Sequence, residues 1–475
     1  MNTYTPFRKA PTYVLAAALA AALGVPATAS AGVFSSIFEL HESTSANGNP
    51  NNADAIDNGM NPAEDWESVN TEYNKVPGIY GGDAVVRVFV PDFPGLPGVS
   101  FTRVQDDPAY GQHCKDVKDL APNATTGDAG CLVITGGIPD KNQITNGYAA
   151  FYVYDGPETA VTDPLGATIN YDEGDGDNLL EHHPGDLFVL MGGDLHAENG
   201  NASWGGWFTR NDLEISNGAF TTGRAIGDIL VVAEFQGGGD DVIFSVARWV
   251  ETGGNAGGGT LQELFTGEDL RCSPTTDNYL GCAISNSNGP EFAPWPYLAK
   301  GDRDASPPAT FSDYFPATAF AEGILNLSAV LRMNGQSVGC LSDFLFETRT
   351  SGQSYTAELK DFLIGSVPLC EISADKTGDM LSKVGDLAQY NIQVENTGIV
   401  TLYKQSITDS LLGDLTSATG PCDENALNQG ESCVDANTCG ASLAPDASCT
   451  ITAWRRVASG DPDPLPNTVT VIYDS

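Results

Sequence analysis

The sequence predicts an all-β protein with a large sandwich of the jelly-roll or lectin-like type, followed by a second, smaller sandwich. Length is the first observation, because 475 residues exceed the size of one ordinary domain. The second is the abundance of turn-forming residues, including 53 glycines. The third is the series of short β-branched and aromatic runs between those turns, which is typical of strands.

The N-terminus has the layout of a secretory signal peptide. Arg8 and Lys9 precede an apolar run over residues 13–25, and small residues follow up to Ala31. The alternative, a membrane anchor, is disfavoured because the run is too short to cross about 30 Å of hydrocarbon. We expect residues 1–31 to be removed on export. The mature chain should then be extracellular or at the cell surface, without inserting into a membrane.

Residues 32–74 are expected to form a polar lead-in, because the stretch 43–52 is too polar to build a core. The large sandwich is predicted over residues 75–370, hereafter the first region. The smaller one is predicted over residues 371–475, hereafter the C-terminal region.

Within the first region, the clearest predicted hairpin joins residues 229–235 to 242–249 through a Gly-rich turn. Both arms are apolar at nearly every position, which predicts strands covered on both faces. A buried helix would show the same pattern, but the flanking glycines favour strands. One helix is predicted over 322–333, where Ile324, Leu327 and Leu331 share a face. Other strands are predicted at 83–90, 149–154 and 186–191.

The C-terminal region carries a set of short motifs between residues 371 and 473. They read "SADKTGDMLSKVGDLAQYNIQVENTG", "ITDSL", "LAPDASCTITAW" and "NTVTV", in that order. As a set they resemble the DUF11 domain, an immunoglobulin-like repeat of bacterial surface proteins. The resemblance implies an immunoglobulin-like sandwich. Because the DUF11 pattern continues with one more edge strand, this domain is expected to lack its last strand.

Motifs of the first region include "EDWESVN", "PDKNQITNGYAAFYVY", "FVLMGGDLHAENGNASWGGWF" and "ETRTSGQSYTAELKDFLIG". Together they resemble an uncharacterised β-rich domain found upstream of DUF11 repeats in secreted bacterial proteins. The resemblance implies no activity. One departure is that Leu195 and His196 follow Gly193-Asp194, where that domain often has an arginine.

The chain is strongly acidic, with a formal net charge of −40 that becomes −42 when Arg8 and Lys9 leave with the signal. Such a surface repels nucleic acid and anionic lipid, so neither is an expected partner. It favours divalent cations and solubility, and simple solvation of an exported protein is the plainer interpretation.

All ten cysteines follow the predicted signal, and their even number predicts disulfides formed outside the cytosol. Pairing of sequence neighbours predicts Cys114–Cys131, Cys272–Cys282 and Cys340–Cys370. Three pairings stay open for the last four, Cys422, Cys433, Cys439 and Cys449.

A Gly-rich acidic loop is the first candidate for metal binding. Asp172, Asp175 and Asp177 could converge on Ca²⁺, which takes 6–8 oxygen ligands. The spacing is not that of an EF-hand, because no glycine stands at its sixth position and no glutamate closes it. A solvated surface loop is the alternative, as it is for the acidic pairs Asp240/Asp241 and Asp302/Asp304.

Histidines offer a second candidate, because two strands joined by a turn could bring His183 near His196 in a zinc site. Adjacent His182 and His183 would point to opposite faces of a strand, so only one could take part. Exposed histidines without a ligand role are the simpler interpretation.

Aromatic residues suggest a glycan-binding site. Trp295 and Tyr297 alternate with prolines, and exposed rings of this type stack on the apolar faces of sugars. Trp204 and Phe208, on one strand face, are expected in the core instead.

Enzyme signatures such as H-E-x-x-H and a Gly-rich phosphate loop do not occur in the sequence. We therefore expect a non-enzymatic, structural or adhesive protein of the cell surface or extracellular matrix. A calcium-assisted glycan-binding module is the alternative, and a polysaccharide hydrolase is a third possibility. Expected partners are glycans or other surface proteins.

Overall fold

The computed structural model describes residues 142–163, 167–172, 178–196, 202–216, 219–236, 241–250, 260–273, 278–297, 311–350, 355–367, 369–379 and 381–474. It also describes residues 34, 66, 86–91, 108–110, 120–121 and 133–135. The predicted signal peptide lies outside these residues. So do Cys114, Cys131, Asp175, Asp177, Asp240, Asp302 and Asp304.

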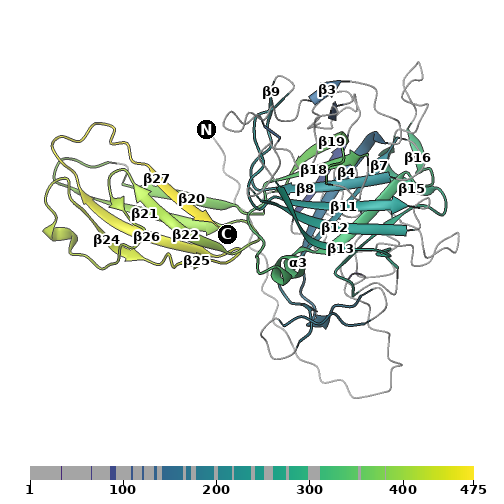
Figure 1. Ribbon diagram of the computed structural model, residues 1–475. Helices are drawn as coiled ribbons and strands as arrows, with labels where there is room; N and C mark the ends of the chain where they lie inside the picture. The colour runs from purple at the N-terminus through teal and green to yellow at the C-terminus, as the bar shows by residue number, and fades with distance from the viewer. Residues whose placement is uncertain are drawn as a thin grey trace, which may run out of the picture. The chain divides into compact units, whose positions relative to one another are not determined.

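The first region is built from two antiparallel sheets. The five-stranded sheet has the order β1 (Val86–Pro91), β4 (Ile144–Val153), β7 (Leu187–Leu195), β17 (Phe320–Asn326) and β14 (Gly281–Ser285). The six-stranded sheet has the order β13 (Thr260–Gly267), β12 (Asp241–Val250), β11 (Ile229–Gln236), β8 (Ala202–Thr209), β18 (Asp343–Arg349) and β19 (Leu359–Ser366). Figure 1 shows these long strands stacked beside one another. The all-β prediction is confirmed.

The two sheets pack face to face through large aromatic side chains opposite glycines. Phe151 of β4 meets Phe208 of β8 edge to face, with ring centroids 5.4 Å apart. Gly193 of β7 faces Phe346 of β18, and a Cβ atom at Gly193 would lie 2.5 Å from the Phe346 ring. The close approach of the sheets at this point therefore requires glycine.

Both sheets are also covered on their outer faces. Trp207, Leu230 and Trp249 lie in a second apolar cluster outside the six-stranded sheet. Outside the five-stranded sheet lies the pair β15 (Glu291–Tyr297) and β16 (Ser312–Phe315). Every residue of β7 is buried as a result. The predicted hairpin of two-sided strands is confirmed as β11 and β12, and every residue of β11 pairs with β12.

The predicted helix over 322–333 is correct only in its second half. The helix α3 spans Leu327–Met333, whereas Phe320–Asn326 form β17. Glu322 lies in register with Gly192 of β7 and Ile284 of β14, so this segment is a central strand. Asn326 ends the strand and starts the helix, because its side chain accepts a hydrogen bond from the amide of Ala329.

Smaller elements complete the first region. The strands predicted at 83–90, 149–154 and 186–191 correspond to β1, β4 and β7. Three short antiparallel pairs are β2 (Pro108–Tyr110) with β3 (Val133–Thr135), β5 (Thr159–Ala160) with β6 (Glu181–His182), and β9 (Ile215–Ser216) with β10 (Ala219–Phe220).

The predicted polar lead-in contributes to the core, contrary to expectation. Phe34 and Trp66 are both buried in the main apolar cluster. The Trp66 indole Nε1 donates a hydrogen bond to Glu322 Oε2 at 2.8 Å. A sequence window that is polar on average thus supplies two large apolar side chains, which an average over the window does not reveal.

The C-terminal region has its own two sheets and its own core. One sheet has the order β20 (Ile372–Gly378), β21 (Leu387–Asn396), β26 (Ser448–Arg456) and β24 (Ser432–Asn437). In the other, β22 (Leu402–Asp409) pairs with β23 (Gly413–Asp414), β25 (Ser442–Leu443) and β27 (Val469–Asp474), and η2 (Glu424–Ala426) is a single 3₁₀ turn. Ile392, Ile407 and Ile451 pack between the sheets. The "NTVTV" motif ends in β27.

Four disulfides join cysteines among the described residues, and two of them confirm the predicted pairs Cys272–Cys282 and Cys340–Cys370. The last four cysteines pair as Cys422–Cys433 and Cys439–Cys449, which resolves the three open alternatives. Disulfides at this density are typical of extracellular proteins. None of the helices in the described part of the chain is long and apolar enough to span a membrane.

Candidate functional site

The predicted calcium loop is described only at its margins. Asp172 is exposed at the last described position before the loop, and Asp175 and Asp177 lie outside the described residues. Among the residues that the structure does describe, no three His, Cys, Asp or Glu side chains are grouped as metal ligands.

The structure separates the histidines that a zinc site would need. His182 is buried at the end of β6, whereas His183 follows that strand and is partly exposed, with Nδ1 3.0 Å from Glu158 Oε1. His196, also buried, follows the far end of β7, whose nine residues extend about 30 Å. The predicted meeting of His183 and His196 is therefore wrong.

Trp295 and Tyr297 are core residues rather than a surface for sugars. Trp295 is 3% exposed and Tyr297 is fully buried. Trp295 Nε1 donates to Asp194 Oδ2 at 3.0 Å, and the Tyr297 hydroxyl donates to the Leu195 carbonyl at 2.7 Å. The proposed stacking role of these two rings is corrected accordingly, because a sugar cannot reach them.

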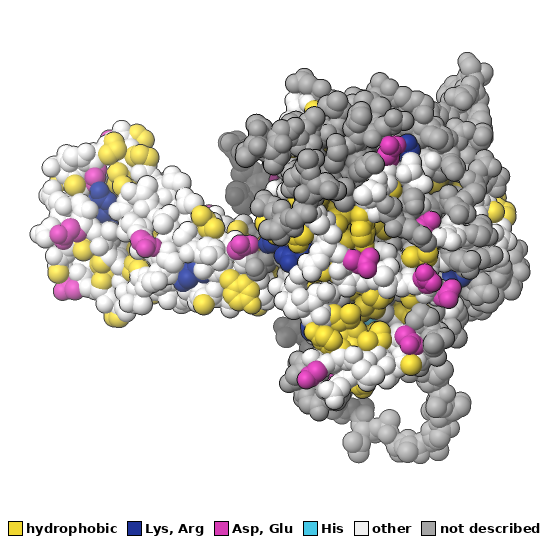
Figure 2. All heavy atoms as spheres, in the orientation of Figure 1, with side chains coloured by type: hydrophobic (Ala, Val, Ile, Leu, Met, Phe, Trp, Pro, Cys, Tyr) yellow, Lys and Arg dark blue, Asp and Glu magenta, His cyan; other side chains and the backbone are white. Residues whose placement is uncertain are grey.

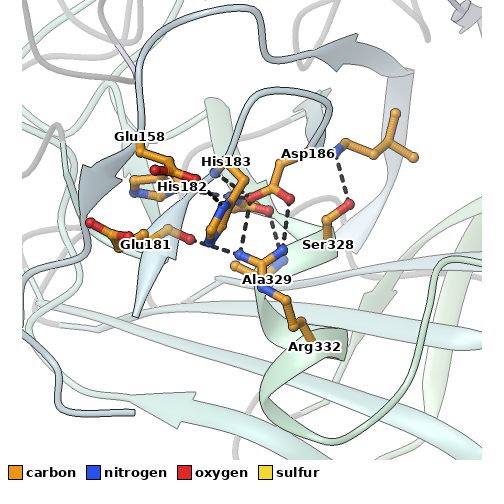
Figure 3. A network of polar contacts seen from close by, with 10 residues as sticks. Glu158, Glu181, His182, His183, Asp186, Ser328, Ala329 and Arg332 are labelled. Atoms are coloured by element: carbon orange, nitrogen blue, oxygen red, sulfur yellow. Dashed lines mark hydrogen bonds and ion pairs between the residues drawn. The ribbon is translucent and has the colours of Figure 1, made fainter. Parts of the chain in front are cut away.

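A polar network surrounds Asp186, at the turn between β6 and β7 (Figure 3). Arg332 of α3 donates to both carboxylate oxygens, with Nη1 2.8 Å from Oδ1 and Nη2 3.3 Å from Oδ2. The backbone amide of His183 donates to Oδ2 at 3.0 Å. Arg332 Nη2 also donates to the Glu181 carbonyl at 2.7 Å. The carboxylate thus links the turn to the helix.

Asn326 is the centre of the buried side of this network. Its Nδ2 donates to Asp186 Oδ2 at 2.7 Å and to His182 Nδ1 at 2.9 Å, while its Oδ1 caps α3. Burial lowers the pKa of His182 from 6.5 to about 4. A neutral imidazole is required here, because Nδ1 accepts from the amide and must carry no proton.

The chemistry of this network is that of a structural link. A bidentate arginine–carboxylate pair fixes geometry as well as charge, and the Ser328 hydroxyl adds a bond from the amide of Leu187 at 2.8 Å. The Tyr171 hydroxyl donates to the Arg332 carbonyl at 3.1 Å. The base of the acidic loop is therefore attached to the same helix.

A second buried carboxylate lies at the end of β7. Asp194 is fully buried and accepts from the side chains of Thr145, Asn146 and Trp295, the last two at 2.8 and 3.0 Å. Burial raises its pKa from 3.8 to about 7, against the lowering effect of these donors. Asp194 could exchange a proton near neutral pH, but its partners hold it inside the fold.

A small hollow of about 20 Å³ lies beside α3. Leu327 and Leu331 of the helix and Ile229 of β11 form its apolar wall, and Arg210 and Arg248 give it positive charge. Its chemistry suits water or a small anion.

Comparison with known proteins adds no family to these observations, because no protein-family model and no curated protein sequence matches the chain. The resemblance to DUF11 stays a prediction from the motifs of residues 371–473.

Proposed function

We propose that this chain is an exported structural or adhesive protein of the cell surface or extracellular matrix. The observation that carries the proposal is the Asp186 network. Its charged groups are matched within the chain, where they attach a helix and a loop to the central sheet. A carboxylate held in this way stabilises geometry and is not presented to a substrate.

The disulfides support the same proposal. Cys272–Cys282 and Cys340–Cys370 fasten segments of the first region, while Cys422–Cys433 and Cys439–Cys449 fasten the C-terminal region. Loops of these lengths each contribute about 2–4 kcal/mol, chiefly by restricting the unfolded chain. Such stabilisation suits a protein that must persist outside the cell.

Expression of the full chain in a secreting bacterial host tests the proposal. We expect a mature product that begins near Gly32, found in the medium or on the cell surface, with no free thiol under denaturing conditions. It should resist protease until a reductant is added. Retention of Met1 in a cytosolic product, or two or more titratable thiols, would contradict the proposal.

A further inference from the structure

The β15–β16 pair has one face that is anchored inside the protein. Trp295 and Tyr297 project from β15 into the core, where they bond to Asp194 and to the Leu195 carbonyl. Phe315 of β16 is fully buried beside them, with its ring centroid 5.0 Å from that of Tyr297. Because alternate residues of a strand point to opposite sides, this anchoring fixes which residues face outward.

The outward face carries a pair of exposed aromatic rings. Phe292 of β15 lies directly opposite Tyr314 of β16, and their centroids are 5.8 Å apart at an interplanar angle of 89°. Phe292 is 41% exposed and Tyr314 is 56% exposed. Pro294 and Pro296 of β15 are partly exposed as well. Figure 2 shows hydrophobic side chains at the rim where these strands lie.

The size of this face decides what kind of partner it fits. A large aromatic side chain offers about 150–250 Å², so the exposed parts of two rings amount to roughly 200 Å². A stable protein interface needs about 800 Å² on each partner. One sugar unit, by contrast, needs a single ring to stack on and polar groups nearby. The paired rings therefore match the scale of a sugar chain better than that of a protein.

The charge of the protein limits which sugars the outward face of β15–β16 can bind. Asp313 alternates with Tyr314 along β16, and Glu291 alternates with Phe292 along β15, so neither carboxylate shares the outward side of the two rings. Ser312, which is polar and uncharged, shares that side with Tyr314. A chain of net charge −40 repels uronates and sulfates.

We propose that the outward face of β15–β16 binds a polysaccharide that carries no negative charge, with Phe292 and Tyr314 as the stacking rings. The proposal rests on the adhesive function proposed above and identifies its ligand class. The anchoring of Trp295 and Tyr297 holds the face in place.

Binding assays on the purified mature protein test this site. Insoluble cellulose and chitin serve as neutral probes, soluble chitosan as an amino-sugar probe and alginate as an anionic probe. We expect binding to at least one uncharged or amino-sugar polymer and none to alginate. The double variant Phe292→Ala/Tyr314→Ala should bind at least tenfold more weakly, whereas Tyr314→Phe should keep most of the affinity.

Tyr403→Ala is the matched control, because Tyr403 is a 54% exposed tyrosine of the C-terminal region. This variant should bind like the unsubstituted protein, and all variants should keep the same melting temperature. Absence of binding to every probe, binding to alginate alone, or unchanged binding by a folded double variant would each overturn the site. So would a self-association that the double variant abolishes. Export and surface location, measured separately, would still decide the broader function.

Discussion

The first region and the C-terminal region differ in how the faces of their sheets are covered. In the first region, strands such as β7 are buried at every residue because both faces of the sheet are covered. In the C-terminal region, β26 alternates between exposed and buried residues along its first half, and β27 alternates between partly buried and exposed residues throughout. A one-faced sheet can direct its polar groups to water, whereas a two-faced sheet must satisfy them inside.

The polar side chains follow this difference. Asp186, Asp194 and Glu322 are buried in the first region, each with hydrogen-bond partners from distant segments. The C-terminal core is mostly aliphatic, and its buried carboxylate Asp409 pairs with Lys376 of the same region. A buried disulfide lies in both cores, Cys272–Cys282 in the first region and Cys439–Cys449 in the C-terminal region. The comparison teaches that the first region matches its buried charges between distant segments, whereas the C-terminal region directs more of its polar groups to water.

Among the variants that should still fold, those that break the Asp186 network should lose the most stability. Asp186→Ala removes the acceptor of Arg332, Asn326 and the His183 amide, which leaves buried donors unmatched. We expect a loss of about 3 kcal/mol in the free energy of unfolding, measured by denaturant titration. Asp461→Ala is the control in the C-terminal region, where the carboxylate accepts from Arg455 and the Ala458 amide. A loss as large in this control would contradict the comparison.

Removal of the Cys439–Cys449 disulfide should lower the free energy of unfolding slightly less than Asp186→Ala does, by about 2–3 kcal/mol, because the disulfide closes a short loop. The matched variant removes Cys272–Cys282, which has the same sequence separation of 10 residues. Because the two loops have equal length, removing either disulfide should lower the free energy of unfolding by the same amount. The C-terminal region is smaller and has a smaller entropy of unfolding, so the same loss of free energy lowers its melting temperature further. We therefore expect the larger shift in melting temperature for Cys439→Ser/Cys449→Ser in scanning calorimetry. If the two changes in melting temperature were equal, or if the Cys272–Cys282 variant had the larger one, loss of a disulfide would not affect the two regions differently.

A third prediction concerns pH and Asp194. Because burial raises its pKa from 3.8 to about 7, its contribution to stability is complete below about pH 4 and is lost as the pH rises through 7. Asp194→Asn cannot titrate, and it weakens the bond from Trp295. We expect this variant to be about 1–2 kcal/mol less stable at pH 4.

The difference in free energy of unfolding between the unsubstituted protein and the Asp194→Asn variant should then become smaller toward pH 8. Burial also raises the pKa of Asp228, to about 6. Asp228 is present in both proteins, so its effect on stability cancels in this difference. A gap that widens with pH would mean that the three donors outweigh burial and keep Asp194 charged.

Local patterns explain the parts of this structure that could be predicted from the sequence. The hairpin of β11 and β12 was visible because two apolar runs flank a Gly-rich turn. Two disulfides followed from pairing of neighbouring cysteines. Both signals depend on residues close together in the chain.

The errors have physical reasons of two kinds. Trp295 and Tyr297 were expected to be exposed, but they lie on the buried side of β15, because the local sequence does not say which side the core occupies. Arg332 and Asp186 are 146 residues apart, so no sequence pattern connected them. Asn326 ahead of a helix was the one available signal, as a preferred N-cap residue, and it marks the boundary that the predicted helix overran.

The smallest expected effect tests whether the C-terminal sheet truly has a solvated face. Gln393 is exposed in the middle of β21, a central strand, between buried Ile392 and Val394. Gln393→Lys should change the free energy of unfolding by less than about 0.5 kcal/mol, because a surface substitution leaves the core intact. Ala150→Lys is the counterpart in β4, a strand whose residues are buried on both sides at this point, and a buried unpaired charge should prevent stable folding there. Circular dichroism and urea titration of the two variants give the answer. A strongly destabilised Gln393→Lys protein would mean that something covers this face, and the one-faced description of the C-terminal region would then be wrong.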